Sequence, residues 1–166
     1  MVQSCQDSDV KEDSHSTTIV GWRECVSLPS IGVPWIKAKL DTGARSSALH
    51  AFDIEEFDDG RRVRFKVRPW QRSMEDIVEV ECDVHDRRVV RSSSGHEENR
   101  IVVLIDVKIG DRVVVAETTL SQRDQMDFRM LIGREALRQG FLLNPRKSFL
   151  TGRPAKIVRR RNHARA

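Results

Sequence analysis

The fold of this chain is decided by one stretch, Trp35-Ile36-Lys37-Ala38-Lys39-Leu40-Asp41-Thr42-Gly43-Ala44. Apolar and charged residues alternate up to Leu40, which predicts a β-strand with one buried face. An acidic residue ends this strand, and a small hydroxyl residue and a glycine follow it. A carboxylate in such a place is unusual unless it is used chemically. Asp41 is therefore the first candidate functional residue.

The composition indicates one soluble globular domain. The chain has 166 residues, of which 39% are hydrophobic and 33% charged, enough to bury a core. No window approaches the roughly 18 apolar residues of a membrane span, and residues 1–11 lack the apolar core of a secretory signal. We therefore expect a cytoplasmic protein with no membrane partner. Cys5, Cys25 and Cys82 are scattered, which predicts free thiols and neither disulfides nor a metal site.

Positive charge is concentrated at the C-terminal end. Residues 146–166 hold eight Lys or Arg and no acid, whereas residues 1–145 hold 21 basic and 25 acidic residues. The run 159–161 is suited to RNA or another polyanion. The alternative, which we prefer at this point, is a solvated tail, because the run lacks aromatic residues on which bases stack.

Short alternating segments describe an all-β domain between residues 18 and 150. Residues 1–17 are polar and predicted to be disordered, and residues 151–166 form the basic tail. Asp58-Asp59-Gly60 predicts a hairpin between two alternating runs. One short helix is expected over residues 133–140, closed by a glycine. A last strand, residues 141–144, follows it, and residues 148–150 are candidates for its extension.

Two motifs give the chain a resemblance to the retropepsin-like aspartic peptidases. These are Leu40-Asp41-Thr42-Gly43-Ala44, similar to that family's active-site loop, and Leu131-Ile132-Gly133-Arg134, similar to its strand-to-helix segment. The likeness covers about residues 26–144, with residues 53–85 as an insertion relative to the viral enzymes. It implies a closed β-barrel with one short C-terminal helix and a two-fold dimer. The chain is more closely similar to a bacterial group associated with RimK-type glutamate ligases, often labelled "ATP-dependent zinc protease".

The residues do not support zinc or ATP dependence. Hydrolysis by zinc in its common format needs His-Glu-x-x-His on a helix, but Arg100 stands where the second histidine of His96-Glu97 would be. The remaining histidines are isolated, and no phosphate-binding Gly-x-x-x-x-Gly-Lys-Ser/Thr loop occurs. We therefore predict no metal and no cofactor.

The chemistry of the loop requires a second carboxylate. A lone exposed aspartate, with a pKa of about 3.9, is a weak base at neutral pH. Two carboxylates about 3 Å apart share one proton, so one activates a water while the other protonates the substrate carbonyl. The chain has one Asp-Thr-Gly, so the second must come from a symmetry-related copy. Thr42 would then bond across the axis, Gly43 would admit the substrate backbone, and Ile132 and Gly133 would support the loop.

Substrate specificity is predicted to depend on Ala44 and Arg45. In the viral enzymes an aspartate stands where this chain has Arg45, and that aspartate contacts the helix arginine to which Arg134 corresponds. Arg134 must therefore find another carboxylate, and Glu135 or an acid near the N-terminus are the candidates. Arg45 would suit an acidic or glutamate-rich peptide, because guanidinium binds carboxylate in a two-pronged fashion. A structural salt bridge at the loop is the open alternative.

A flap over the cleft is predicted at the small, polar tip Ser92-Ser93-Ser94-Gly95. The Asp58-Asp59-Gly60 hairpin is its rival, and the basic face of that hairpin, Arg62, Arg64 and Lys66, would line an acidic-substrate groove or simply face solvent. Together these features predict a homodimeric aspartic peptidase acting on peptides or proteins. The alternatives are an inactive dimeric adaptor and an RNA- or ribosome-associated protein that binds through its tail.

Overall fold

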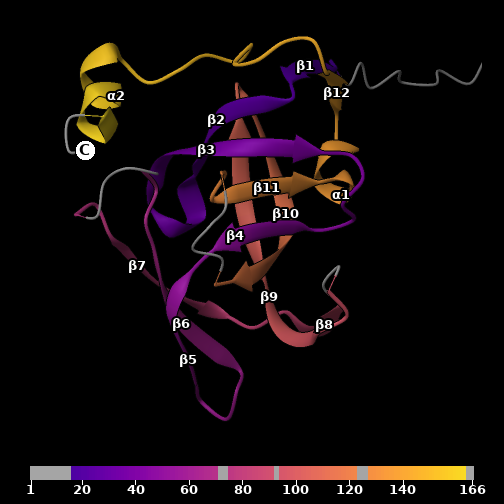
Figure 1. Cartoon of the computed structure of the whole chain (residues 1–166), viewed down its shortest axis with the longest axis vertical. Coiled ribbons are helices and arrows are strands. Elements are labelled where there is room, and N and C mark those ends of the chain that lie inside the picture. The colour runs from indigo at the N-terminus through magenta and orange to yellow at the C-terminus, as the bar shows by residue number, and fades with distance from the viewer. Residues whose placement is uncertain (1–15, 71–74, 92–93, 123–126, 164–166) are drawn as a thin grey trace, which may run out of the picture.

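The computed structural model describes residues 16–70, 75–91, 94–122 and 127–163, with the backbone alone for residues 161–163. These residues form a mostly β architecture with two α-helices and one 3-10 turn (Figure 1). The strands are β1 (Thr18–Gly21), β2 (Arg23–Leu28), β3 (Val33–Asp41), β4 (Ser47–His50), β5 (Phe52–Phe57), β6 (Arg62–Val67), β7 (Val78–Asp83), β8 (Asp86–Arg91), β9 (Glu97–Ile109), β10 (Arg112–Ser121), β11 (Met130–Gly133) and β12 (Phe141–Asn144). The helices are η1 (Pro29–Ile31, a 3-10 turn), α1 (Arg134–Leu137) and α2 (Lys156–His163). Neither α-helix in the described ranges has the length or the apolar run that crossing a bilayer requires.

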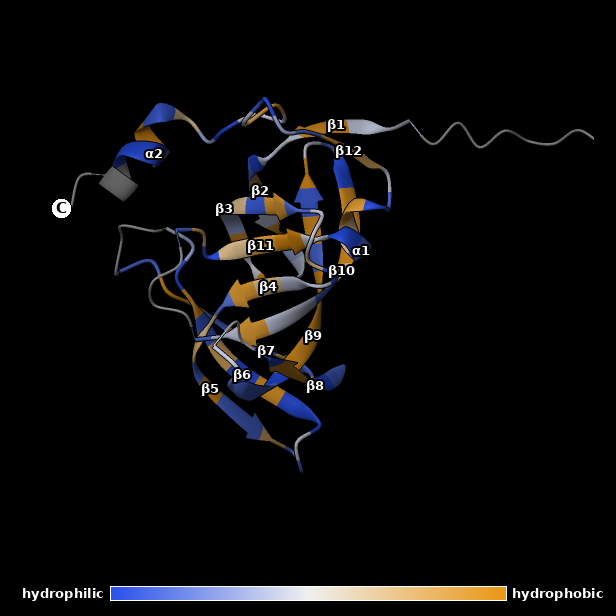
Figure 2. Ribbon diagram, turned by 45° about the vertical axis from the view of Figure 1, so that its right-hand side comes forward, coloured by the Kyte–Doolittle hydropathy of each residue, from blue (hydrophilic) through white to orange (hydrophobic). Residues whose placement is uncertain are grey.

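The main sheet is organised around β3. Its strand order is β10-β4-β11-β3-β2-β9-β8, with β3 antiparallel to β2 and parallel to β11. Ile36, Ala38 and Leu40 are buried, as the alternation of β3 predicts. Figure 2 shows hydrophobic segments on β4, β9 and β11 inside the domain and hydrophilic ones on the outer strand β5. β9 also pairs with β10, so the strand at one edge of this order is hydrogen-bonded to a strand near the other edge. Closure into a barrel stays a prediction, as does the two-fold dimer.

Residues 53–85, predicted to be an insertion, carry most of a separate three-stranded sheet, β5-β6-β7. The predicted Asp58-Asp59-Gly60 hairpin is present between β5 and β6, and all three turn residues have positive φ. Side chains of β6 alternate across the sheet, so Val63, Phe65 and Val67 are buried in the core.

The small sheet of β1 and β12 joins the two ends of the domain. The strands run parallel, with Thr18 opposite Phe141 and Gly21 opposite Asn144. The proposed extension of β12 over residues 148–150 is wrong. There the amide of Leu150 donates to the Glu24 carboxylate at 2.9 Å, and that of Phe149 to the Arg23 carbonyl at 2.9 Å, so the segment turns across β2.

The expectation of one short helix is also wrong, because α2 is a second helix within the segment expected to be a tail. Val158 on this helix lines a cavity together with Trp35 and Trp70, so tertiary contact accompanies the helix. The sequence pattern did not predict this helix, because the segment is mostly basic and has only a few apolar residues that can pack.

Candidate active site

Asp41 lies at the end of β3, directly opposite Gly133 in the parallel pairing with β11. Its side chain is 30% exposed, which leaves the carboxylate accessible to a ligand. Oδ1 accepts a hydrogen bond of 2.9 Å from the amide of Gly43, and Oδ2 lies 3.9 Å from Nζ of Lys39. The strand end and the following turn thus hold the carboxylate in one orientation.

The loop after Asp41 is a tight turn with its outer side open. The Ala44 amide donates to the Asp41 carbonyl at 3.3 Å, and Thr42 and Gly43 are exposed. A methyl group placed on Gly43 would meet only Oδ1 of Asp41, at 3.2 Å. This position is therefore open on its outer side, and the admission of a substrate backbone at Gly43 stays a prediction.

Gly133 lies against the backbone of the loop, the close approach that its motif predicts. A methyl group at this position would lie 2.5 Å from the carbonyl carbon of Ser46 and 2.8 Å from the carbonyl oxygen of Arg45. The start of α1 then binds the loop directly. The amide of Arg134 donates to the Ala44 carbonyl at 2.7 Å, and that of Glu135 to the Arg45 carbonyl at 3.0 Å.

Glu135 is not the partner of Arg134. Nη1 of Arg134 donates to the Thr42 carbonyl at 3.2 Å, so the guanidinium ties the first turn of α1 to the Asp41 loop. The carboxylate of Glu135 instead forms an ion pair with Arg138, 3.4 Å away and three residues further along α1. The other suggested partner, an acid near the N-terminus, falls largely on residues 1–15, outside the described ranges.

The side chain of Arg45 is exposed and makes no ion pair with any residue the structure describes. The structural salt bridge that was the open alternative is therefore not seen within these ranges. Two cations, Arg45 and Lys39, flank the Asp41 carboxylate in sequence, and Lys39 also does so in space. Side chains of this kind can receive a carboxylate of a ligand.

Sequence reasoning missed two supports of the loop, Ser47 and Trp22. The hydroxyl of Ser47, which is buried, accepts from the Gly133 amide at 3.1 Å, and its carbonyl accepts from Oγ1 of Thr119 at 3.2 Å. The carbonyl of Trp22 accepts from the Leu40 amide at 2.9 Å. The one signal for Ser47 in the sequence is its position at the start of a strand shortly after the Asp-Thr-Gly turn.

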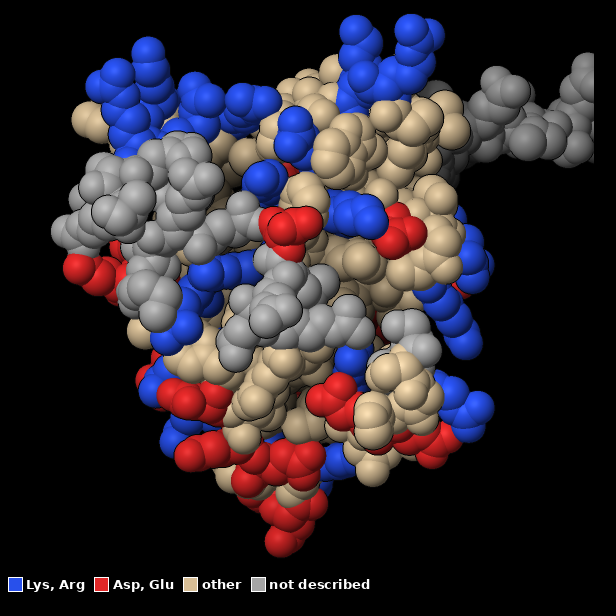
Figure 3. Space-filling view, in the orientation of Figure 1, with Lys and Arg blue, Asp and Glu red and all other residues tan. Residues whose placement is uncertain are grey.

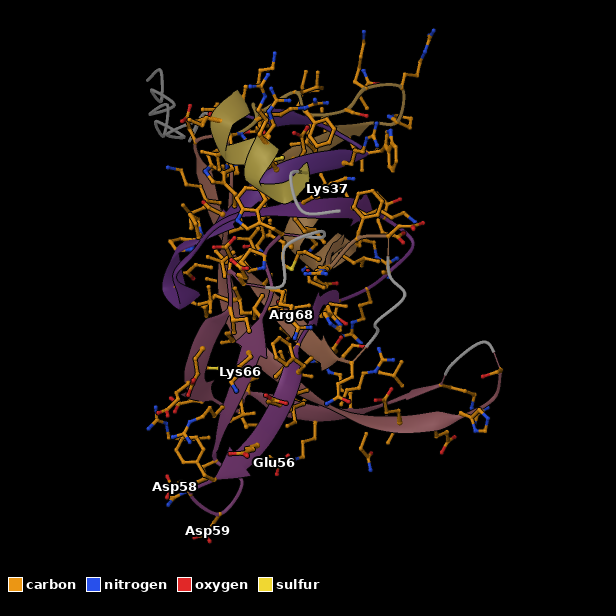
Figure 4. All side chains as sticks on the ribbon, turned by 60° about the vertical axis from the view of Figure 1, so that its left-hand side comes forward. Lys37, Glu56, Asp58, Asp59, Lys66 and Arg68 are labelled. Atoms are coloured by element: carbon orange, nitrogen blue, oxygen red, sulfur yellow. The ribbon has the colours of Figure 1, made fainter. Side chains whose placement is uncertain are left out.

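The predicted flap tip falls at the turn between β8 and β9. Ser92 and Ser93 lie outside the described residues, whereas Ser94 and Gly95 are exposed, and Gly95 has a φ of +85°. Figure 4 shows the β8–β9 hairpin extending from the body as an arm, while the rival β5–β6 hairpin ends at Asp58 and Asp59. The assignment of the flap to residues 92–95 stays a prediction.

The basic face of the rival hairpin is neutralised by neighbouring acids. Arg62 pairs with Asp83 at 3.5 Å, Arg64 with Glu81 at 2.5 Å, and Lys66 with Asp53 at 2.9 Å. Cross-strand carboxylates thus pair with these cations in this structure, which favours the solvent-facing alternative, and their lining of an acidic-substrate groove stays a prediction.

Among the described residues, no three His, Cys, Asp or Glu side chains lie close enough together to hold a metal ion. The prediction that the reaction uses no metal or cofactor is a separate matter and stays a prediction.

Known proteins resemble this chain over most of its length. A protein of unknown function from Legionella pneumophila, Lpg0085, has a similar structure, with a TM-score of 0.69 and 29% sequence identity over 82% of this chain and 99% of that one. Proteins named probable alpha-L-glutamate ligase also match. The one from Shewanella pealeana is 40% identical over 141 residues, covering 84% of this chain and 31% of that protein. The one from Desulfotalea psychrophila is 39% identical and covers 83% and 30%. The chain thus spans about a third of the length of these curated relatives.

A family described as retropepsin-like aspartic endopeptidase RimB matches residues 19–154. This range contains the Asp41 loop, Gly133 and α1, which the geometry brings together. The chain therefore belongs to the RimB-like family of retropepsin-like proteins.

Proposed function

We propose that this protein is an aspartic peptidase in which Asp41 from each of two copies activates a water molecule to hydrolyse a peptide bond. The observation that carries the proposal is the accessible Asp41 carboxylate, fixed at a strand end by the Gly43 amide. The loop around it is held from below by Gly133 and by the first residues of α1. Such rigidity keeps a reacting group in place.

The proposed reaction uses the two carboxylates in different protonation states. Close carboxylates share one proton, so the ionised one takes a proton from water while the neutral one protonates the substrate carbonyl oxygen. The water oxygen then bonds to the carbonyl carbon, and the amide nitrogen leaves after it is protonated. Titration belongs to the pair and not to either Asp41 alone.

A second copy of the chain is required because the sequence contains one Asp-Thr-Gly. A two-fold axis at the loops would bring both Asp41 side chains together. An apolar pair supports association on this side of the domain. Ile19 of β1 and Leu142 of β12 are register partners, and they are 58% and 61% exposed. The Trp22 carbonyl, which follows β1, binds the strand that ends at Asp41.

Acidic or glutamate-rich peptides are the proposed substrates. Nζ of Lys39 lies 3.9 Å from the Asp41 carboxylate, so this cation stands beside the place where the scissile bond would lie. Arg45, which follows the Asp41 loop in sequence and has no ion-pair partner within the described residues, is the proposed second cation. The ligase name of the curated relatives concerns glutamate, which agrees with this class of substrate, although the chain matches only about a third of those proteins.

The test compares the wild-type chain with Asp41→Asn on glutamate-rich and apolar peptides between pH 4 and 8, with products identified by mass spectrometry. Asp59→Asn is the matched control, because Asp59 lies at the tip of the β5–β6 hairpin, where asparagine tolerates its positive φ. Asp41→Asn should abolish cleavage and retain the folded state, whereas Asp59→Asn should cleave normally.

Mixing the two chains tests the shared site. An excess of Asp41→Asn chain should suppress wild-type cleavage, because a mixed dimer has an aspartate at position 41 in only one of its two chains. Cleavage by Asp41→Asn alone, or wild-type activity unaffected by the excess, would exclude the mechanism. Wild-type protein that cleaves no peptide would favour the inactive adaptor.

A further inference from the structure

We propose that the face formed by α2 and the cavity beside it binds single-stranded nucleic acid, with a base in the cavity and phosphates on the basic side chains around it. This inference does not depend on the peptidase proposal. It rests on an aromatic-lined cavity, on buried arginine donors that lack acceptors, and on the separation of charge across the molecule.

The cavity has a volume of about 440 Å³ and is lined mainly by apolar side chains, within the range of small-ligand sites. Trp35 from the start of β3 and Trp70 from the segment after β6 supply two aromatic rings, and Val158 of α2 completes the wall. Asp76 is its one acidic lining residue. Tryptophan rings stack on bases of any sequence, and a carboxylate accepts hydrogen bonds from exocyclic amines.

This cavity is separate from the candidate active site. Trp35 stands near the beginning of β3 and Asp41 at its end. Six residues of extended strand span about 20 Å. A ligand in the cavity would therefore not occupy the Asp41 loop.

Basic side chains gather next to the cavity on the outer face of β2 and β3. Cys25 on β2 and Lys37 on β3 are register partners. Burial raises the pKa of the half-buried Cys25 thiol, and the charges of Arg153, Lys37 and Arg159 oppose this increase. Figure 4 shows Lys37 beside α2. Three cations converging on one strand position are suited to a phosphate backbone.

Two buried arginine donors, Nε of Arg159 and Nε of Arg68, have no acceptor among the described residues. In sequence, Arg159 directly follows the lining residue Val158, and Arg68 directly precedes the lining residues Pro69 and Trp70. Buried donors in folded proteins nearly always have a partner. An anionic ligand would supply the acceptor to Arg159.

The charge distribution favours approach of a polyanion to this face. Residues 146–166 carry eight basic residues and no acid. Figure 3 shows Lys and Arg side chains collected at the α2 end, whereas Asp and Glu collect at the opposite end, over the β5–β6 hairpin. Such a field steers an anion to one pole. Nucleic acid fits better than an acidic peptide, because only nucleic acid brings bases for an aromatic cavity.

The experiment measures fluorescence anisotropy of labelled 12-nucleotide RNA and DNA of the same sequence with the full chain at 50 and 200 mM salt. Four phosphate contacts predict a fall in affinity of about 50-fold between these salt concentrations, from the slope of about 0.7 per contact for single strands. Tryptophan fluorescence should be quenched on binding. Preference for RNA or DNA identifies which nucleic acid the face takes.

Paired variants locate the site. Arg159→Gln with Arg160→Gln should weaken binding at least tenfold, and Trp70→Leu should weaken it with a smaller change in salt dependence. Arg61→Gln with Arg91→Gln is the control, because it removes the same charge at exposed positions away from α2. Thermal unfolding checks that each variant is folded.

Three outcomes would overturn the proposal. The first is no binding at micromolar protein and 50 mM salt. The second is an equal loss in the control variant, which would indicate an effect of net charge alone. The third is displacement of the RNA by a polyglutamate peptide at equal charge concentration, which would indicate a surface for acidic peptides.

Discussion

Replacing Gly133 with alanine tests the packing of β11 against the Asp41 loop. The φ of Gly133 is −87°, which alanine adopts freely, so the effect is steric only. The new methyl group would lie 2.5 Å from the Ser46 carbonyl carbon. Carbon atoms in contact are about 3.5 to 4.0 Å apart. The loop must therefore retreat by about 1 Å.

A retreat of this size disrupts the hydrogen bonds that α1 makes to the loop. The bonds from the Arg134 amide to the Ala44 carbonyl and from the Glu135 amide to the Arg45 carbonyl measure 2.7 and 3.0 Å. Each contributes about 1 kcal/mol, and the remaining overpacking costs about 1 to 3 kcal/mol. We expect the free energy of unfolding to fall by about 3 to 5 kcal/mol.

Urea and thermal unfolding followed by circular dichroism measure the effect. A domain of this size loses about 2 to 4 °C in Tm per kcal/mol, so Tm should fall by roughly 6 to 20 °C. Gly43→Ala is the matched control, because its methyl group meets only Oδ1 of Asp41, at 3.2 Å. Its unfolding free energy should change by less than about 1 kcal/mol.

The opposite result would refute the reasoning. If Gly133→Ala unfolds within about 0.5 kcal/mol of the wild-type protein, in the range of a neutral surface substitution, then β11 and the loop are not in tight contact in solution. If Gly43→Ala abolishes peptide cleavage and leaves stability unchanged, then Gly43 provides access to the site and does not support the loop.

Two further predictions concern carboxylates away from the site. The buried side chain of Glu24 accepts hydrogen bonds from the amides of Gly21, Leu150 and Thr151 and from the Thr151 hydroxyl. Glu24→Gln should therefore lower the unfolding free energy by about 3 kcal/mol and speed hydrogen exchange at the Leu150 amide. Unchanged exchange at Leu150 would contradict this role. The hydrogen bond from Arg88 lowers the pKa of Glu117 from its ordinary value of 4.5. The ionised Glu117 therefore stabilises the fold fully above pH 4.5, and this stabilisation is lost as the pH falls through the lower pKa of the folded state. Glu117→Gln should therefore be less stable than wild type at pH 7 but equal to it in strong acid, and a stability gap that persists in acid would refute this assignment.

The elements that sequence predicts well are those set by local pattern. The alternation of β3 and the Asp58-Asp59-Gly60 turn depend on neighbouring residues, and both are present. The motif around Gly133 predicts its close approach to the loop because a glycine there has few other uses. These patterns also identify Asp41 as the central residue of the candidate site.

The parts that sequence did not predict depend on distant partners. Pairing of Arg64 with Glu81 requires the register of β6 with β7, which no local pattern supplies. The bond from Arg134 to the Thr42 carbonyl depends on how α1 leaves β11. The helix α2 has few apolar residues, so its contact with the cavity wall was not apparent from composition.

The pairing of β1 with β12 implies an order of events during synthesis. Thr18 has its strand partner at Phe141, 123 positions later, so β1 leaves the ribosome long before the strand that holds it exists. Contacts this distant in sequence form late, after loop closure over the intervening chain. Trp22, whose carbonyl binds the strand leading to Asp41, lies directly after β1. A nascent chain would therefore lack a finished loop until its domain is nearly complete, which would delay the proposed peptidase activity until synthesis of the domain has ended.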